Sequence, residues 1–131
     1  MGNVDFLMQE LSADEFLKCN EYVKDNMKAI EKLIGKKVII RSYGAGAFYG
    51  TLNEAETVQD KWMVELLNCR RLWRWAGACS LSQLAVEGTK KPEDCLFSVR
   101  QMSIVISSVV EISECTDIAI ESIENVREWK I

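Results

Sequence analysis

The sequence predicts an α+β domain in which a long N-terminal amphipathic helix packs on a mainly antiparallel β-sheet, together with two short helices. Three observations predict this class. Apolar residues recur at helical spacing over residues 12–34, β-branched residues dominate from Lys37 onward, and two later capping patterns each precede a short helical stretch. Apolar residues are 48% and charged residues 27% of the 131 residues, a balance typical of a single soluble globular domain. We therefore expect one domain over residues 1–131, with a helical segment at 1–35 and a β-rich core at 36–131.

The helix over residues 12–34 begins with a capping box, because Ser12 is followed three residues later by Glu15. Gly35 follows the last apolar residue, where a left-handed residue often ends a helix. The apolar face consists of Phe16, Val23, Met27, Ile30 and Ile34. We expect this face to pack on the sheet, because the heptad repeat of a coiled coil is not sustained.

The β-rich core contains six predicted strand segments. They are Val38–Tyr43, Phe48–Leu52, Lys61–Cys69 running on through Trp73, Leu96–Val99, Met102–Ser107 and Val109–Ser113. The glycines at 44 and 46 lie between two strands, so they predict a hairpin turn rather than the strand–loop–helix of a dinucleotide site. A tight turn is expected near Ser108, between the last two strands.

Two short helices are predicted from their N-caps. Ser80 and Gln83 form a second capping-box pattern, and Gly88 closes that helix. Thr116 followed by Asp117 caps a last helix that runs through Ile123. Residues 90–94 lie between these helices and predict a loop.

Histidine is absent from the whole chain, which excludes Ser-His-Asp and Cys-His catalysis and any imidazole metal site. The five cysteines show no Cys-x-x-Cys pair and no zinc-knuckle spacing, so we expect no metal and no cofactor. Their odd number, and a start without signal-peptide features, favour reduced thiols in a cytoplasm. No apolar run approaches the ~20 residues of a membrane span, so we expect no membrane partner.

Positive charge is concentrated in one part of a chain whose net charge is −4. Residues 35–75 hold seven Lys or Arg against four Asp or Glu, whereas residues 1–34 and 101–131 are acidic. A local cationic zone on an acidic protein suits a small anion better than a long polyanion, so we expect no long nucleic acid as partner. In a second interpretation, these arginines pair with acids of the terminal helices.

The stretch from Arg70 to Trp75 carries the main candidate site. In an extended strand Arg71, Trp73 and Trp75 share one face, and Arg70 lies on the other. Guanidinium groups offer forked donors to a phosphate, and indole rings stack on bases. The second interpretation makes the two indoles part of the core and the arginines part of an intersubunit set of salt bridges.

Neighbouring polar side chains complete the candidate pocket. The helix that begins after Ser80 adds hydroxyl groups and free amides suited to an anion, and the end of the first strand closes the pocket. The full predicted ligand-binding set is Arg41, Tyr43, Arg70, Arg71, Trp73, Trp75, Ser80, Ser82 and Gln83. No nucleophile has a nearby base in the sequence, so we expect no catalysis.

A resemblance to a family of small, uncharacterised phage and prophage proteins rests on a long motif. The motif reads Arg70-Arg71-Leu72-Trp73-x-Trp75-x-Gly77-Ala78-x-Ser80-Leu81-Ser82-Gln83-Leu84-Ala85-x-Glu87-Gly88, and continues as Lys91-Pro92-Glu93-x-Cys95-x-Phe97, Glu111-Ile112-x-x-Cys115-Thr116, Ser122-Ile123 and Trp129-Lys130. The resemblance covers about residues 37–130. It implies a bacteriophage or prophage origin, a host bacterial cytoplasm as the location, and no settled activity.

These observations lead to two hypotheses about function. The first is a non-catalytic phage accessory protein that sequesters a small anionic, nucleotide-like ligand, as phage sponges hold a host alarm signal; the likeness to sponges is one of size and origin. We expect such a protein to be a homo-oligomer, because a shared pocket desolvates the charges. The alternative is an assembly or protein-interaction module without a small-molecule ligand. An enzyme using Cys79 or a carboxylate is a third reading of the same residues.

Overall fold

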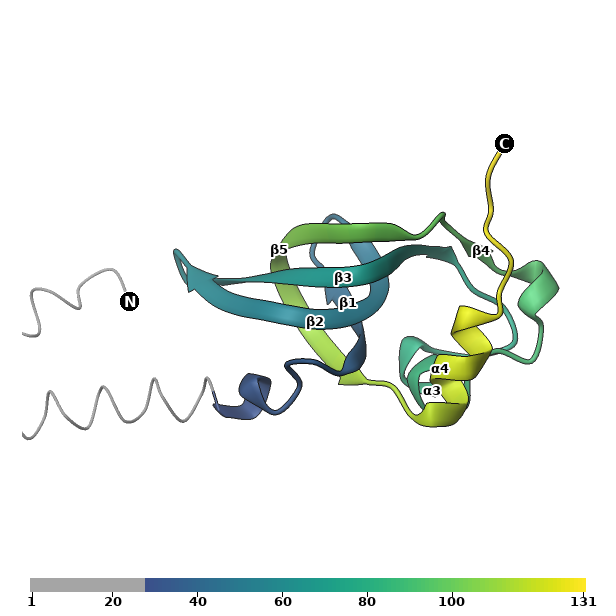
Figure 1. Ribbon diagram of the computed structural model, residues 1–131, viewed down its shortest axis with the longest axis horizontal. Coiled ribbons are helices and arrows are strands. Elements are labelled where there is room, and N and C mark those ends of the chain that lie inside the picture. The colour runs from purple at the N-terminus through teal and green to yellow at the C-terminus, as the bar shows by residue number, and fades with distance from the viewer. Residues whose placement is uncertain (1–27) are drawn as a thin grey trace, which may run out of the picture.

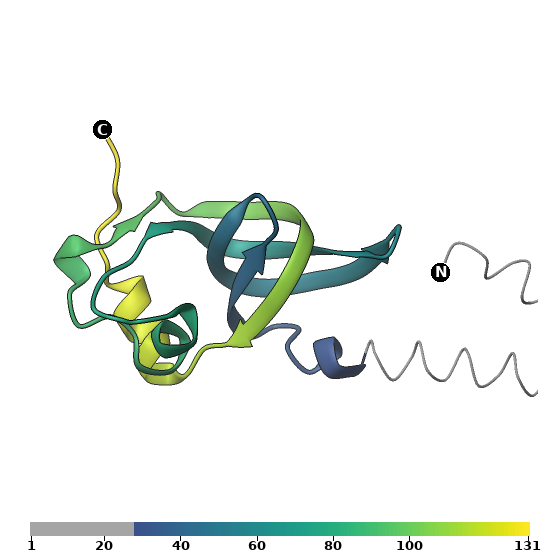
Figure 2. The same cartoon turned by 180° about the vertical axis from the view of Figure 1, so that it is seen from behind.

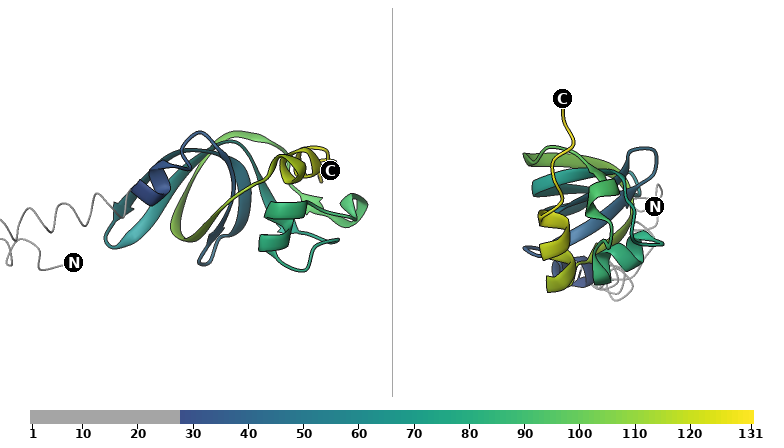
Figure 3. Two further views of the ribbon diagram at one scale, coloured as in Figure 1. Left: turned by 90° about the horizontal axis from the view of Figure 1, so that it is seen from below. Right: turned by 90° about the vertical axis from the view of Figure 1, so that its right-hand side faces the viewer.

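The computed structural model describes residues 28–131, and five antiparallel strands make up most of this part of the chain (Figure 1). The strands are β1 (Lys37–Ser42), β2 (Gly46–Val58), β3 (Lys61–Arg74), β4 (Leu96–Phe97) and β5 (Gln101–Glu114). Their order is β2-β1-β5-β3-β4, and β2 also pairs with β3. Because β2 has β1 on one side and β3 on the other, β1, β2, β3 and β5 close into a small barrel, visible in Figure 3.

The interior of the barrel holds one of two apolar clusters. Its buried members are Val38, Ile40, Phe48, Leu52, Val64, Leu66, Cys69, Ile106 and Val109. Val38 and Ile40 point into this interior, whereas Ile39 between them belongs to the second cluster on the outer face. Strand β1 is therefore buried on both faces, which explains its unbroken run of β-branched residues.

The second apolar cluster lies between the outer face of the barrel and the short helices. These helices are α3 (Leu81–Glu87), the 3₁₀ turn η1 (Pro92–Asp94) and α4 (Asp117–Glu124), and they gather at one end of the barrel (Figures 1 and 2). Ile39, Tyr49 and Leu72 supply the barrel side of this cluster, and Leu84 and Ile123 supply the helix side. Of the described elements, these helices cover one part of the outer face.

The caps predicted for the two short helices are confirmed. Ser80 Oγ accepts from the backbone N–H of Gln83 at 3.1 Å, and Thr116 Oγ1 accepts from that of Ala119 at 3.1 Å. Gly88 ends α3 with φ +75°, and a Cβ there would meet Ser122 Oγ at 2.5 Å, so only glycine fits. Residues 92–94, predicted as loop, form the 3₁₀ turn η1.

The two predicted strands around Ser108 form one strand, β5, so the prediction of a turn there is wrong. Ser108 adopts φ +54° and bends the strand without reversing it. Among the described strands, β5 pairs with β3 alone before the bend; after it β5 pairs with β1, and Val109 still pairs with Trp62 of β3. The hydroxyl of Ser42 donates to the carbonyl of Ser107 at 2.7 Å and holds the bend against the end of β1. A Ser-Ser pair predicts a turn because both residues favour turns, but the partners on either side keep the chain extended.

The predicted fold class is also wrong. The described chain is a mostly antiparallel five-stranded β-sheet with three short helices, not an α+β domain built around a long N-terminal helix. Most of the predicted helix over residues 12–34 lies outside the described residues. Within them, residues 28–31 are helical, and Ile30 and Leu33 pack against the barrel interior cluster. The long strands β2, β3 and β5, of 13, 14 and 14 residues, make up most of the described part.

Candidate functional site

A hollow at the edge of the helical cover brings together four of the nine predicted ligand-binding residues. It has a volume of about 340 Å³, and its lining residues are Arg41, Trp75, Ser80, Leu81, Ser82 and Glu111. These residues come from β1, the segment after β3, the start of α3, and β5. We refer to this feature as the rim hollow.

The position of the rim hollow follows from the alternation of side chains along β1. Ile39 lies on the outer face under the helices, and Arg41, two residues further along, lies on the same face. Ala47, which is opposite Arg41 on β2, belongs to the outer cluster, whereas Arg41 itself is exposed. The apolar cover therefore ends between Ile39 and Arg41, and the rim hollow begins there.

Arg41 keeps most of its hydrogen-bonding capacity. Its Nε lies 4.0 Å from Glu111 Oε1, at the limit of an ion pair, and both side chains are about half exposed. Such solvated pairs contribute at most a few tenths of a kcal/mol to about 1 kcal/mol. Among residues 28–131, no partner for the two terminal nitrogens of this guanidinium is found, so they remain available to an anion.

Trp75 and the two serines give the rim hollow one apolar wall and several polar groups. The indole of Trp75 is half-buried and packs against the outer apolar cluster while lining the hollow. Ser80 Oγ already accepts from Gln83, which leaves its O–H free to donate. Ser82 is exposed and one residue inside α3. The arrangement offers a cation, a stacking surface and hydroxyl donors to one small ligand.

Gln83 does not contribute free groups to the rim hollow. Its Oε1 accepts from the backbone N–H of Cys79 at 2.7 Å, and its Nε2 donates to Glu87 Oε2 at 2.7 Å. In a standard capping box the side chain of Gln83 would accept from the N–H of Ser80, but here it accepts from the N–H of Cys79, one residue earlier. Gln83 stabilises the first turn of α3.

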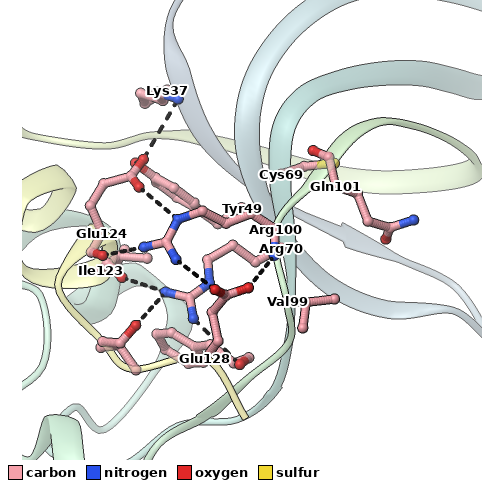
Figure 4. A network of polar contacts seen from close by, with 12 residues as sticks. Lys37, Tyr49, Cys69, Arg70, Val99, Arg100, Gln101, Ile123, Glu124 and Glu128 are labelled. Atoms are coloured by element: carbon pink, nitrogen blue, oxygen red, sulfur yellow. Dashed lines mark hydrogen bonds and ion pairs between the residues drawn. The ribbon is translucent and has the colours of Figure 1, made fainter. Parts of the chain in front are cut away.

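Arg70, the central residue of the predicted site, is instead buried beneath α4, with 1% of its surface exposed. Its guanidinium donates to the carbonyls of Ile123 and Val126, both at 2.9 Å, and to two carbonyls of the β4 segment, Phe97 at 3.4 Å and Ser98 at 3.2 Å. Burial lowers the pKa of this guanidinium. Arg70 therefore uses four of its five N–H donors to join β3, β4 and the end of α4, and its burial keeps it from a ligand (Figure 4).

Arg71, Trp73 and Tyr43 lie away from the rim hollow. Arg71 donates from Nη1 to the carbonyl of Ala45 at 2.9 Å, and its Cζ lies 4.4 Å from the centre of the Phe48 ring. It therefore secures the β1–β2 turn. Trp73 is 65% exposed and Tyr43 is 84% exposed, and neither lines a described cavity.

A network of charges beside Arg70 was not predicted from the sequence. Arg100 donates to the carbonyl of Glu124 and pairs with the carboxylates of Glu124 and Glu128, at 3.5 and 3.7 Å (Figure 4). The hydroxyl of Tyr49 donates to Glu124 Oε1 at 2.8 Å, and Lys37 Nζ lies 3.6 Å from the same carboxylate. The spacing of four between the two glutamates was the only sequence signal, and it does not identify Arg100 as their partner.

The network and its surroundings shift several pKa values. The backbone N–H of Arg100 donates to Glu128 and lowers the pKa of that carboxyl. Burial, reinforced by the bond to Glu124, raises the pKa of the Tyr49 hydroxyl. Burial also raises the pKa of the Cys115 thiol to about 12.

The four described cysteines differ in their exposure. Cys69, Cys95 and Cys115 are buried, Cys79 is exposed, and all four are free thiols. Among residues 28–131, no three Cys, Asp or Glu side chains form a group that would hold a metal ion. No helix in this range has the length and apolar character needed to cross a membrane.

Comparison with known proteins places the chain in one family. A family profile described as "Domain of unknown function (DUF6948)" matches residues 35–123, so the chain belongs to this family. The matched range includes all five strands, α3 and most of α4, and therefore the whole rim hollow. No curated protein and no solved structure matches the chain.

Proposed function

We propose that this member of the DUF6948 family is a non-catalytic protein that binds and sequesters a small anionic, nucleotide-like ligand in the rim hollow. The observation that carries the proposal is the convergence of Arg41, Trp75, Ser80 and Ser82 on one hollow. A volume of about 340 Å³ is at the lower end of the ~300–1,000 Å³ typical of small-molecule sites, which favours a ligand of mononucleotide size.

Each lining residue has a distinct role in this proposal. The free terminal nitrogens of Arg41 receive a phosphate, as a forked donor, while Glu111 holds the other side of the guanidinium. The half-buried indole of Trp75 stacks on a base, because its packing against the outer cluster fixes the ring in place. The hydroxyls of Ser80 and Ser82 donate to polar edges of the ligand.

Binding rather than turnover is favoured by the chemistry of these side chains. Among residues 28–131, Ser80 Oγ accepts from a backbone amide with no base beside it, and Glu111 is the sole carboxylate that lines the hollow. The phage or prophage origin and the host cytoplasm rest on the resemblance over about residues 37–130, and the role as a sponge rests on a likeness in size and origin; all three are part of the proposal.

Thermal unfolding with separate nucleotide probes tests the proposal. The probes are mononucleotides, cyclic nucleotides and, as the anion alone, inorganic phosphate. A true ligand at 100 times its Kd should stabilise the fold by about 2.7 kcal/mol, which a rise in Tm reports. Arg41→Gln should weaken this ligand by about 10- to 100-fold, because a charge-assisted bond to phosphate contributes about 1.5–3 kcal/mol.

Arg74→Gln is the matched control, because Arg74 is an exposed arginine outside the rim hollow. It should leave the affinity within about twofold of the parent protein. Two results would contradict the proposal. One is a panel in which no probe raises Tm, and the other is an equal loss of affinity in the Arg41→Gln and Arg74→Gln variants.

The second candidate function, an assembly or interaction module, is favoured by the exposure of Trp73. The indole of Trp73 is 65% exposed at the end of a barrel strand. Exposed indoles are enriched in protein–protein interfaces, so this side chain suits a contact with a partner. In this case Trp73→Ala should reduce the particle mass measured by light scattering, while no small molecule binds.

A further inference from the structure

Within residues 28–131 the sheet has three strand edges outside the barrel closure, and they differ in how they are protected. The edge of β4 is covered by the C-terminal segment, since Phe97 bridges Glu128 and the N–H of Trp129 donates to the Phe97 carbonyl at 2.8 Å. The edge of β2 beyond Leu52 carries Glu54 and Glu56, which are exposed. Charged side chains and covering segments are common ways to prevent edge-to-edge pairing.

The third edge, on β5, has neither protection from any described residue. Within the described residues β1 pairs with β5 only after the bend at Ser108, so residues 102–106 pair with β3 on one side alone. Residues 101–110 contain no charged residue and no proline. Met102 and Val105 on this segment are 88% and 60% exposed. Figure 1 shows this part of β5 at the margin of the sheet.

We propose that the free edge of β5 is the interface of a homodimer, in which β5 of a second copy pairs antiparallel with residues 102–106 about a two-fold axis. Backbone hydrogen bonds between the two edges would supply the affinity. With the axis near Ile104, Ser103 of each copy lies opposite Val105 of the other, and the exposed Val105 side chains become covered.

The charge pattern selects a second copy as the occupant. Self-pairing about a two-fold axis brings the same short segment of each copy together, so a charge near the axis would lie close to its like-charged counterpart. The β5 segment is uncharged and avoids this repulsion, although the whole chain carries a net charge of −4. The same pairing at the β2 edge would bring Glu54 and Glu56 close to their own copies, which disfavours it.

The assembly should stop at two chains. The other edge of residues 102–106 is occupied by β3, so each copy offers one free β5 edge. A two-fold axis uses both edges at once and leaves none for a third chain. The rim hollow lies elsewhere on the molecule, with Glu111 beyond the bend, so the dimer proposal does not depend on the proposed ligand.

Sedimentation equilibrium from low to high micromolar concentration tests the dimer. The parent chain should change from one to two times the 14.9 kDa chain mass. Val105→Lys adds a charge to the edge and should weaken the dimer by about tenfold or more. Val110→Lys is the matched control: Val110 is 59% exposed on the same strand, but its edge is already paired with β1, so this variant should dimerise like the parent within about twofold.

A second edge variant is needed because Val105 lies opposite Glu65 on β3, so a lysine at position 105 gains an acidic neighbour within its own chain. Ser103→Lys is that second variant. Ser103 lies opposite Leu67, so Ser103→Lys should weaken the dimer without that compensation. The proposal is overturned if the parent chain stays monomeric throughout the range, or if both edge variants dimerise like Val110→Lys. It is also overturned if Trp73→Ala alone dissociates the dimer, a result that would place the interface at the second candidate surface.

Discussion

Arg70 and Arg41 lie on the same outer face of the barrel, and their surroundings give them opposite roles. Arg70 is opposite Tyr49 in the sheet and is covered by α4, and four of its five N–H donors bond to backbone carbonyls. Arg41 lies beyond the helical cover and keeps two nitrogens toward solvent. The comparison shows that the boundary of the helical layer determines which arginine stabilises the fold and which can receive a ligand.

The comparison predicts that substitution of Arg70 causes the largest loss in the free energy of unfolding. Arg70→Met removes four hydrogen bonds and leaves the carbonyls of Ile123 and Val126 without these donors, so the free energy of unfolding should fall by about 3 kcal/mol. Urea unfolding followed by circular dichroism measures this loss. Arg71→Met removes one exposed hydrogen bond and should cost about 1 kcal/mol, so equal losses in the two variants would contradict the role given to Arg70.

A smaller, pH-dependent effect is expected at Tyr49 in the same network. The pKa of its hydroxyl is raised in the folded protein, so its contribution to stability is present below about pH 10, the pKa of an unfolded tyrosine, and is lost as the pH rises above that value. At neutral pH, Tyr49→Phe should cost about 1 kcal/mol through the lost bond to Glu124.

Urea unfolding of the parent protein and of Tyr49→Phe at a series of pH values measures the difference. The gap in stability between them should narrow as the pH rises from 9 to 11. A gap that stays constant over this range would show that Tyr49 titrates in the folded protein as it does in the unfolded chain.

The smallest change in stability is expected at Arg41. Its contact with Glu111 is long and solvated, so Arg41→Gln should change the free energy of unfolding by less than about 0.5 kcal/mol. Urea unfolding of Arg41→Gln measures this change in the free energy of unfolding. The ligand-binding test also needs this measurement, because a loss of affinity is informative only if the variant is as stable as the parent protein. A loss near that of Arg70→Met would mean that both arginines are structural, and the contrast between them would disappear.

Sequence patterns predicted the local elements of the β-rich core well. The alternation from Lys61 to Trp73 predicted nearly all of β3, and Ser80, Gly88 and Thr116 located the ends of the short helices, because caps and alternation act between near neighbours. The bend at Ser108 was interpreted as a turn, because its extended path depends on pairing with β3 and β1 at distant positions.

The candidate site was predicted only in part, for a related reason. Arg41, Trp75, Ser80 and Ser82 do line one hollow, whereas Arg70, Arg71, Trp73, Tyr43 and the side-chain amide of Gln83 have other surroundings. The carbonyls that surround Arg70 come from residues up to 56 positions further along the chain. Composition and spacing reveal which residues can bind an anion, but not which of them a distant helix will cover.

The bend at Ser108 has a thermodynamic consequence for the two proposals. It places Glu111 of the rim hollow and Val105 of the free edge on one continuous strand, six residues apart. If dimerisation changes the affinity for a ligand by some factor, the ligand must change the dimerisation constant by the same factor, since the two equilibria form a closed cycle. The dimerisation constant measured with and without nucleotide would therefore give the coupling free energy between the rim hollow and the β5 edge.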